Sequence, residues 1–191
     1  MMAAKKNHNA DPTFGKYTAE QARQYAIGRA GSYPAELYTS VLQYHDSTGG
    51  HMHEYVDVGC GPGKATQDLA PLFDTAIGTD HSQAMIEVAR SADYKAKNGP
   101  IHFAVAAGED FDLPGLEPGS VDLITSAMAV GSRYWNIISV DTVLGPLVRH
   151  GQILERGSHS IATWRYSSTL DMCFTISAVS FVEGKSTTLR S

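Results

Sequence analysis

Residues 56–63, VDVGCGPG, place three glycines at alternate positions after a short apolar run. A run of this kind is typical of a buried strand that leads into a loop where a ligand can approach the backbone. In a strand–loop–helix turn, Gly59 permits the sharp turn, Gly61 admits the ligand and Gly63 permits close packing of the next helix. The spacing therefore predicts a ligand site, whose chemistry depends on the residues around the loop.

Those residues favour a cationic ligand over a dinucleotide. A dinucleotide fingerprint requires another glycine at position 64, which is Lys64 here, and Pro62 has no N–H to offer a phosphate. Asp57, at the strand end, would repel a diphosphate and attract an ammonium or sulfonium group. S-adenosylmethionine carries both of these cations. An NAD-binding oxidoreductase is the disfavoured alternative, because Lys64 and Asp57 both oppose it.

Two further segments can hold the rest of such a ligand. Asp80 closes the apolar run AIGTD, 21 residues after Gly59, where the tip of the adjacent strand can accept both ribose hydroxyls. Dinucleotides and S-adenosylmethionine share this device, so Asp80 does not discriminate between them. The segment AAGEDFDLPG follows the third expected strand, where an adenine would lie. Glu109 or Asp110 can accept from the adenine amino group, and Phe111 offers apolar contact.

Composition limits the class of protein. The 191 residues suit one domain, and 42% hydrophobic with 18% charged residues is ordinary for a soluble globular chain. The formal charge of −5 argues against nucleic acid as the main partner, because phosphate neutralisation requires a basic face. Without a secretory h-region or a membrane-spanning run, a cytoplasmic location is expected. Cys60 is expected to be a packing residue, and His51 and His53 lack a third ligand for a metal.

A doubly wound sheet would bring the candidate residues together. Residues 1–16 are polar and are predicted to be a flexible tail. Thr18 with Gln21 predicts a capping box that opens the first of two helices over residues 17–48, the second beginning at Pro34 and preceding a polar loop, HDSTGGHMH. Strands are expected at 55–58, 75–79, 101–106 and 121–126, with a turn at 98–100 and a further candidate strand at 160–166. Helices are expected at 64–73, with Leu72 on the buried side, and after Ser82. This alternation predicts an α/β fold, with a Rossmann-like parallel sheet and flanking helices.

The segments VDVGCGPG, AIGTD, AGEDFDLP and SVDLITSAMAV, in this order, resemble the class I S-adenosylmethionine-dependent methyltransferases over about residues 14–130. The likeness is greatest to the small-molecule branch, which includes trans-aconitate methyltransferase-like and fungal secondary-metabolism enzymes. It implies methyl transfer from S-adenosyl-L-methionine to a carboxylate or hydroxyl of a small molecule. It also implies roles for particular residues: Asp57, Gly59, Gly61 and Gly63 at the methionine end, Asp80 at the ribose, and Glu109 or Asp110 with Phe111 at the adenine. The residues that resemble the family's lid over cofactor and substrate are Tyr17, Tyr25, Arg29 and Tyr33.

The C-terminal third departs from the family pattern. Residues 131–151, which begin GSRYWN, do not resemble the family, and the chain is expected to lack the last strands of the seven-stranded sheet. Residues 131–191 are therefore predicted to be an irregular or truncated part of a single domain, residues 17–191, whose cofactor-binding core is 54–130. Two alternatives remain: an active methyltransferase, or a catalytically weak or inactive protein that binds cofactor or a partner. No catalytic base is predicted, since in-line displacement at a methyl carbon depends mainly on positioning.

Overall fold

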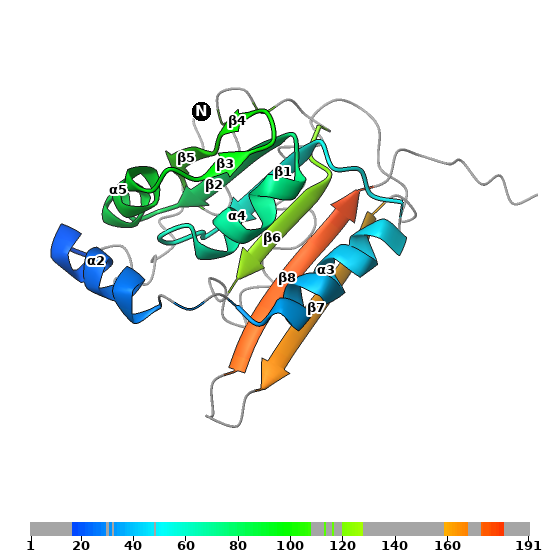
Figure 1. The fold of residues 1–191 in the computed structure, drawn as a ribbon, viewed down its shortest axis with the longest axis horizontal. Helices are drawn as coiled ribbons and strands as arrows, with labels where there is room; N and C mark the ends of the chain where they lie inside the picture. The colour runs from blue at the N-terminus through cyan, green and yellow to red at the C-terminus, as the bar shows by residue number, and fades with distance from the viewer. Residues whose placement is uncertain are drawn as a thin grey trace, which may run out of the picture.

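A computed structural model describes residues 17–29, 31, 33–47, 49–107, 113, 116 and 120–127, together with the backbone of residues 159–167 and 173–181. Its main sheet has the strand order β5-β2-β1-β6-β8-β7 (Figure 1). The four parallel neighbours are β5 (His102–Val105), β2 (Thr75–Asp80), β1 (Glu54–Val58) and β6 (Leu123–Ala127). The predicted α/β fold with a parallel sheet is confirmed.

The register of this sheet gathers the candidate residues at one edge. Asp57 of β1 lies level with Gly78 of β2 on one side and with Thr125 of β6 on the other. Asp80 ends β2 and lies level with Val105 of β5. Because the strands are parallel, their carboxyl ends share an edge, and the loop that follows β1 lies at that edge.

Local sequence signals account for the helix starts. Thr18 accepts a hydrogen bond from the Gln21 N–H, and the Gln21 side chain accepts one from the Thr18 N–H, which confirms the capping box that opens α2 (Ala19–Gly28). Ser82 caps α5 (Gln83–Ser91) by accepting from the Met85 N–H. Helix α2 packs against α5, and α3 (Ala35–Ser47) lies along β7 and β8 (Figure 1).

The structure corrects three local expectations. The expected polar loop begins later, because α3 continues to Ser47 and His45 is fully buried, with its Nε2 2.7 Å from the His51 carbonyl oxygen. The helix after the glycine loop, α4 (Lys64–Leu69), passes into a 3₁₀ turn, η1 (Ala70–Leu72), at Pro71. The change of period leaves Leu72 39% exposed instead of buried. The expected turn at residues 98–100 includes a short strand, since β4 (Gly99–Pro100) pairs with β3 (Lys95–Ala96).

Two strands from the C-terminal third extend the sheet beyond β6. The backbone of β8 (Cys173–Phe181) runs antiparallel to both β6 and β7 (His159–Ser167), so β8 lies between them. A strand was expected near residues 160–166, and β7 confirms it. The chain was expected to lack the last strands of the sheet and to be irregular after residue 131. Strands β7 and β8 correct this expectation for residues 159–167 and 173–181, and the described sheet has six strands. The predicted tail, residues 1–16, and the unfamiliar segment, residues 131–151, lie outside the described residues.

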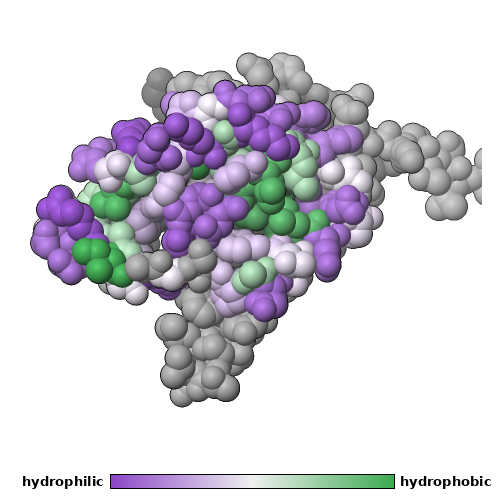
Figure 2. Space-filling view, viewed as in Figure 1, coloured by the Kyte–Doolittle hydropathy of each residue, from purple (hydrophilic) through white to green (hydrophobic). Residues whose placement is uncertain are grey.

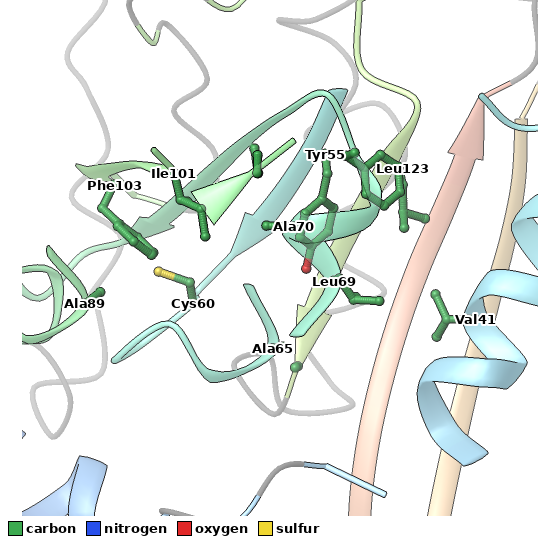
Figure 3. Close-up of a cluster of buried hydrophobic side chains, with 14 of the residues drawn as sticks. Val41, Tyr55, Cys60, Ala65, Leu69, Ala70, Ala89, Ile101, Phe103 and Leu123 are labelled. Atoms are coloured by element: carbon green, nitrogen blue, oxygen red, sulfur yellow. The ribbon is translucent and has the colours of Figure 1, made fainter. Parts of the chain in front are cut away.

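Apolar side chains cover both faces of the sheet. Alternation along β1 sends Tyr55 to one face and Val56 and Val58 to the other, as expected for a strand buried on both sides. Figure 3 shows the cluster on the Tyr55 face, where Phe103 and Cys60 lie close together beside α5. Outside, hydrophilic side chains cover much of the face in Figure 2, and apolar ones gather near α4. Within the described residues, no helix is both long and apolar enough to cross a membrane.

Candidate functional site

The loop between β1 and α4 is built on three glycines with positive φ: 70° at Gly59, 55° at Gly61 and 84° at Gly63. Glycine adopts these angles at little cost, whereas other residues are strained there. A Cβ on Gly63 would lie 3.1 Å from Cζ of Phe103, so this glycine allows α4 to approach β5 closely. A Cβ on Gly61 would meet no atom of the described residues within 4 Å. The backbone at Gly61 is therefore open to a ligand.

The side chain of Asp80, at the end of β2, is hydrogen-bonded to this loop. Its Oδ2 accepts a hydrogen bond from the Gly61 N–H at 3.0 Å, and its Oδ1 accepts one from the Ser82 N–H at 2.8 Å. The Asp80 carboxylate thereby links the glycine loop to the start of α5. An ionised carboxylate offers about four lone-pair positions, so Asp80 can still accept hydroxyl groups from a ribose. His81 adds a partly exposed imidazole, with its Nδ1 3.6 Å from Asp80 Oδ1.

Asp57 is fully buried on β1, two residues before the same loop. Thr66 Oγ1 donates to its Oδ2 at 2.6 Å, and Thr125 Oγ1 donates to its Oδ1 at 2.9 Å. Burial raises the pKa of Asp57 to about 6, and the hydrogen bonds from the two threonines act against that rise. Because the side chain has no exposed surface, Asp57 makes no direct contact with solvent, and only its charge can reach a ligand at the loop.

The four residues of the expected lid form one chain of contacts. The Tyr17 and Tyr25 rings meet edge to face at 5.9 Å between centroids, and the Arg29 guanidinium carbon lies 5.6 Å from the Tyr25 ring centroid. Arg29 Nη1 donates to the Tyr33 hydroxyl at 3.3 Å, and this hydroxyl donates to the Ala127 carbonyl oxygen at 3.5 Å. Burial raises the pKa of Tyr33 to about 12. The chain thus runs from α2 to the carboxyl end of β6, at the same sheet edge as the glycine loop.

The remaining candidates are divided between packing residues and residues that the structure leaves undescribed. Cys60 is buried, burial raises the pKa of its thiol well above its usual range, and its Sγ donates to the Gly61 carbonyl oxygen at 3.6 Å. This environment confirms the expected packing role. Glu109, Asp110 and Phe111 lie outside the described residues, so their placement at an adenine stays a prediction.

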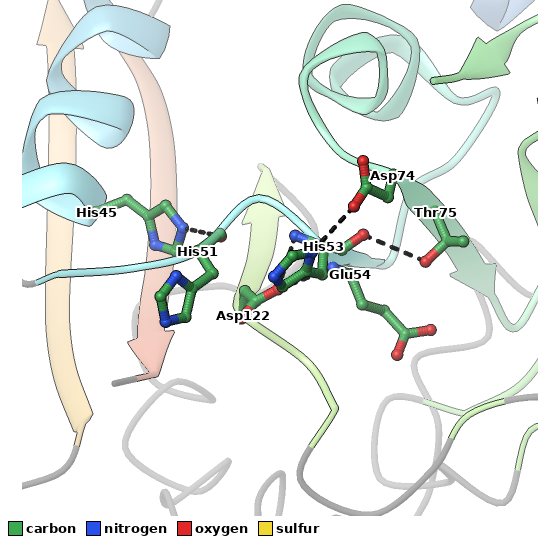
Figure 4. Close-up of polar contacts among 7 residues, drawn as sticks. All are labelled: His45, His51, His53, Glu54, Asp74, Thr75 and Asp122. Carbon is green, nitrogen blue, oxygen red and sulfur yellow. Dashed lines mark hydrogen bonds and ion pairs between the residues drawn. The ribbon is translucent and has the colours of Figure 1, made fainter. Parts of the chain in front are cut away.

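The histidines of the opposite sheet edge have structural partners. His53 Nδ1 lies 2.9 Å from Asp74 Oδ2, while Asp122 Oδ2 accepts from the backbone N–H groups of His53 and Glu54 (Figure 4). Among the residues that the structure describes, no cluster of three or more His, Cys, Asp or Glu side chains could hold a metal ion. This edge supports the start of β1 and lies away from the glycine loop.

Sequence reasoning missed Thr66 and Thr125. Thr66 lies one residue after Ala65 and three before Leu69 on α4, so helical periodicity alone could have assigned it to the buried face. Thr125 contacts Asp57 because β6 pairs with β1 in one particular register. Nothing local in the sequence fixes that register.

Known proteins resemble the part of the chain that contains the glycine loop. Residues 56–144 match the methyltransferase domain family. The chain is 38% identical over 100 residues to the Probable S-adenosylmethionine-dependent methyltransferase CRG1 of Saccharomyces cerevisiae, a match that covers 52% of this chain and 33% of the yeast protein. Over residues 56–144 the chain is therefore similar to a methyltransferase domain, and the yeast relative is named as dependent on S-adenosylmethionine. The matched part of the chain thus spans about a third of the length of the yeast protein.

Two further proteins are similar to this chain, one in sequence and one in fold. A stretch of 37 residues is 57% identical to Trans-aconitate 2-methyltransferase of Variovorax paradoxus, covering 18% of this chain and 14% of that protein. In fold, the chain is similar to a methyltransferase-like crystal structure from Methanococcus maripaludis, with a TM-score of 0.51 and 22% identity over 84% of this chain and 66% of that one.

The site of this methyltransferase domain suits the cofactor of its family, S-adenosylmethionine. The backbone is open at Gly61, the Asp80 carboxylate lies beside it, and the buried negative charge of Asp57 lies on the strand before the loop. A cationic sulfonium and ammonium group are favoured near such charges, whereas a diphosphate is not.

Proposed function

We propose that this protein transfers the methyl group of S-adenosylmethionine to a carboxylate or hydroxyl oxygen of a small molecule. The observation that carries the proposal is the open Gly61 backbone bound to Asp80, in a loop that follows the strand with the buried Asp57 carboxylate. The local identity to a trans-aconitate methyltransferase supports a carboxylate acceptor. The formal charge of −5 favours a small acceptor over nucleic acid. The resemblance to fungal secondary-metabolism enzymes supports a role in secondary metabolism.

In this proposal each part of the site holds one part of the cofactor. Asp80 accepts the ribose hydroxyls, and Glu109 or Asp110 with Phe111 holds the adenine. The methionine end lies along Gly59, Gly61 and Gly63, where the charge of Asp57 favours its cationic groups. The lid formed by Tyr17, Tyr25, Arg29 and Tyr33 closes over the cofactor and the acceptor.

The chain acts mainly by holding the reactants in line. S-adenosylmethionine supplies a methyl group on a positively charged sulfur. A carboxylate acceptor already carries its negative charge and needs no general base, while a hydroxyl acceptor must also lose a proton. Orientation of acceptor, methyl carbon and sulfur along one axis can supply much of the rate enhancement. The described residues that serve this purpose are Asp80 with the glycine loop on the cofactor side and Arg29 with Tyr33 on the lid.

Calorimetry on the purified chain tests cofactor use. We expect binding of S-adenosylmethionine and S-adenosylhomocysteine, and none of NAD. Binding of NAD without either sulfur compound would overturn the proposal. Turnover is tested with S-adenosylmethionine labelled in its methyl group and a panel of carboxylic acids, phenols and alcohols, with buffer alone as the control. Cofactor binding without transfer to any acceptor would instead favour the alternative, a catalytically weak or inactive protein that binds cofactor or a partner.

A further inference from the structure

We infer that Thr66 and Thr125 are positioning residues that hold the Asp57 carboxylate on the strand before the glycine loop, where its charge assists binding of the cationic cofactor. This role rests on the proposed function, because the charge serves binding only if the ligand is a cation. It assigns a task to two threonines to which the family resemblance gives no role. The supporting observations are the geometry of the carboxylate, its burial and the groups that surround it.

The carboxylate is held from two different elements. Thr66 approaches from α4 and donates to Oδ2, while Thr125 approaches from β6 and donates to Oδ1. Both threonines are fully buried. Each oxygen therefore has one hydroxyl donor, and the plane of the carboxylate is fixed relative to both the helix and the sheet.

A further hydroxyl orients Thr125. The Tyr55 hydroxyl lies 2.7 Å from Thr125 Oγ1. An ionised carboxylate only accepts hydrogen bonds, so the single hydrogen of Thr125 is committed to Asp57 and Tyr55 must be the donor to Thr125. Tyr55 is itself fixed, because it is fully buried and stacks on Phe73 at 5.2 Å between ring centroids. The chain of hydrogen bonds thus runs in one direction, from the core to the carboxylate.

Packing alone does not account for this arrangement. A charged group that loses all contact with water costs folding free energy even when it is hydrogen-bonded, and a neutral side chain would fill the space more favourably. The position is also the one from which a charge reaches the loop, since Asp57 lies two residues before Gly59. A fixed negative charge at this point favours a sulfonium or ammonium group near it.

The surrounding groups leave the threonines as the main source of stabilisation for the charged form. Burial raises the pKa of Asp57, and repulsion from Asp80 on β2 raises it further. Burial keeps the neighbouring phenols and thiol neutral, with raised pKa values; these groups are Tyr33, Tyr38, Tyr55 and Cys60. Hydrogen bonds from Thr66 and Thr125 lower the pKa of Asp57.

The test measures S-adenosylmethionine and S-adenosylhomocysteine affinity by calorimetry from pH 5 to 8. Thr66→Val and Thr125→Val remove each hydroxyl at nearly constant shape, and Thr66→Ser and Thr125→Ser restore it. At pH 7 we expect each valine variant to bind S-adenosylmethionine about ten-fold more weakly, and each serine variant to stay within about two-fold of wild type. In the valine variants, the pH below which affinity falls should move upward.

Two comparisons keep the outcomes distinct. Asp57→Asn should weaken S-adenosylmethionine more than S-adenosylhomocysteine, whose sulfur carries no charge, and it serves as the second measurement if a valine variant does not fold. Equal weakening of valine and serine variants, or an unchanged pH profile in folded valine variants, would overturn the positioning role. Wild-type protein that binds neither sulfur compound would instead overturn the proposed function itself.

Discussion

At the scale of single residues, the buried charge of Asp57 lowers the stability of the fold and, in the proposed function, favours binding of the cofactor. Its pKa in the folded chain, about 6, is above the ordinary value of 3.8. Between these two values the folded state binds the proton more tightly than the unfolded state does, so the free energy of unfolding falls as pH rises from about 4 to about 6. Above that window the penalty is complete, on the order of 3 kcal/mol, because each pKa unit corresponds to about 1.4 kcal/mol.

Asp57→Asn should therefore stabilise the protein while it weakens the proposed site. We expect the free energy of unfolding at pH 7 to rise by about 1–3 kcal/mol, because a neutral amide avoids the cost of burying a charge. The fall between pH 4 and pH 6 should largely disappear. Urea unfolding at a series of pH values measures both effects, with Asp93→Asn on an exposed side chain as the matched control. A variant that is less stable at pH 7 and keeps the fall would show that the fold needs the charge.

Asp80 combines two tasks that one substitution can separate. Asp80→Ala leaves the N–H groups of Gly61 and Ser82 without their acceptor, which should cost about 1–3 kcal/mol of stability. If Asp80 also binds the ribose, the wild-type protein should bind adenosine more tightly than 2′-deoxyadenosine, and Asp80→Ala should abolish that preference. Calorimetry with the two nucleosides measures the difference. A preference that survives the substitution would place the ribose elsewhere.

At the scale of elements, the glycine loop and β5 fit together around one aromatic ring. Phe103 lies level with Gly78 in the neighbouring strand, and a Cβ on Gly78 would come within 2.7 Å of the ring. The same ring limits the space beside Gly63. The two glycines thus make room for Phe103, which fixes where α4 begins and where the loop lies.

Alanine substitutions should distinguish the packing glycine from the ligand glycine. Gly63→Ala combines an unfavourable positive φ with a 3.1 Å contact to Phe103, whereas Gly61→Ala has the positive φ and open space. We expect Gly63→Ala to lose about 1 kcal/mol more stability than Gly61→Ala, as judged by urea unfolding. Gly61→Ala should lose more affinity for S-adenosylhomocysteine relative to its stability change. The opposite ranking on both measurements would mean that the ligand approaches at Gly63.

The sequence predicted those elements whose ends are marked by residues close together in the chain. The Thr18 capping box and the Ser82 cap depend on residues within one helical turn, and both are confirmed. The exposure of Leu72 depends on a 3₁₀ turn at Pro71, which periodicity does not reveal. The contact of Thr125 with Asp57 depends on strand register, a property of distant segments. Local patterns therefore predicted the loop and its acidic residues, but not the hydrogen bonds that hold them.

At the scale of the whole molecule, the position of β8 connects the C-terminal hairpin to the site. Thr125 of β6 lies level with Asp57 on one side and with Ala178 of β8 on the other. Strand β8 is an inner strand of the described sheet, and β7 is its edge. Each interior N–H of β8 therefore has a neighbouring strand to bond, whereas alternate N–H groups of β7 point away from β8.

Ala178→Pro tests whether this hairpin supports the site. Proline removes a ladder hydrogen bond wherever it replaces an inner-strand residue, so we expect a loss of about 3 kcal/mol or more of stability. Because the substitution loosens β6 at Thr125, binding of S-adenosylmethionine should also weaken in the folded fraction. Amide hydrogen exchange of the wild-type protein supplies the control: consecutive slow amides are expected along β8 and alternating ones along β7. If β8 amides exchanged fast while those of β1 and β6 stayed protected, the hairpin would not brace β6, and Thr125 would depend on Tyr55 and the parallel strands alone.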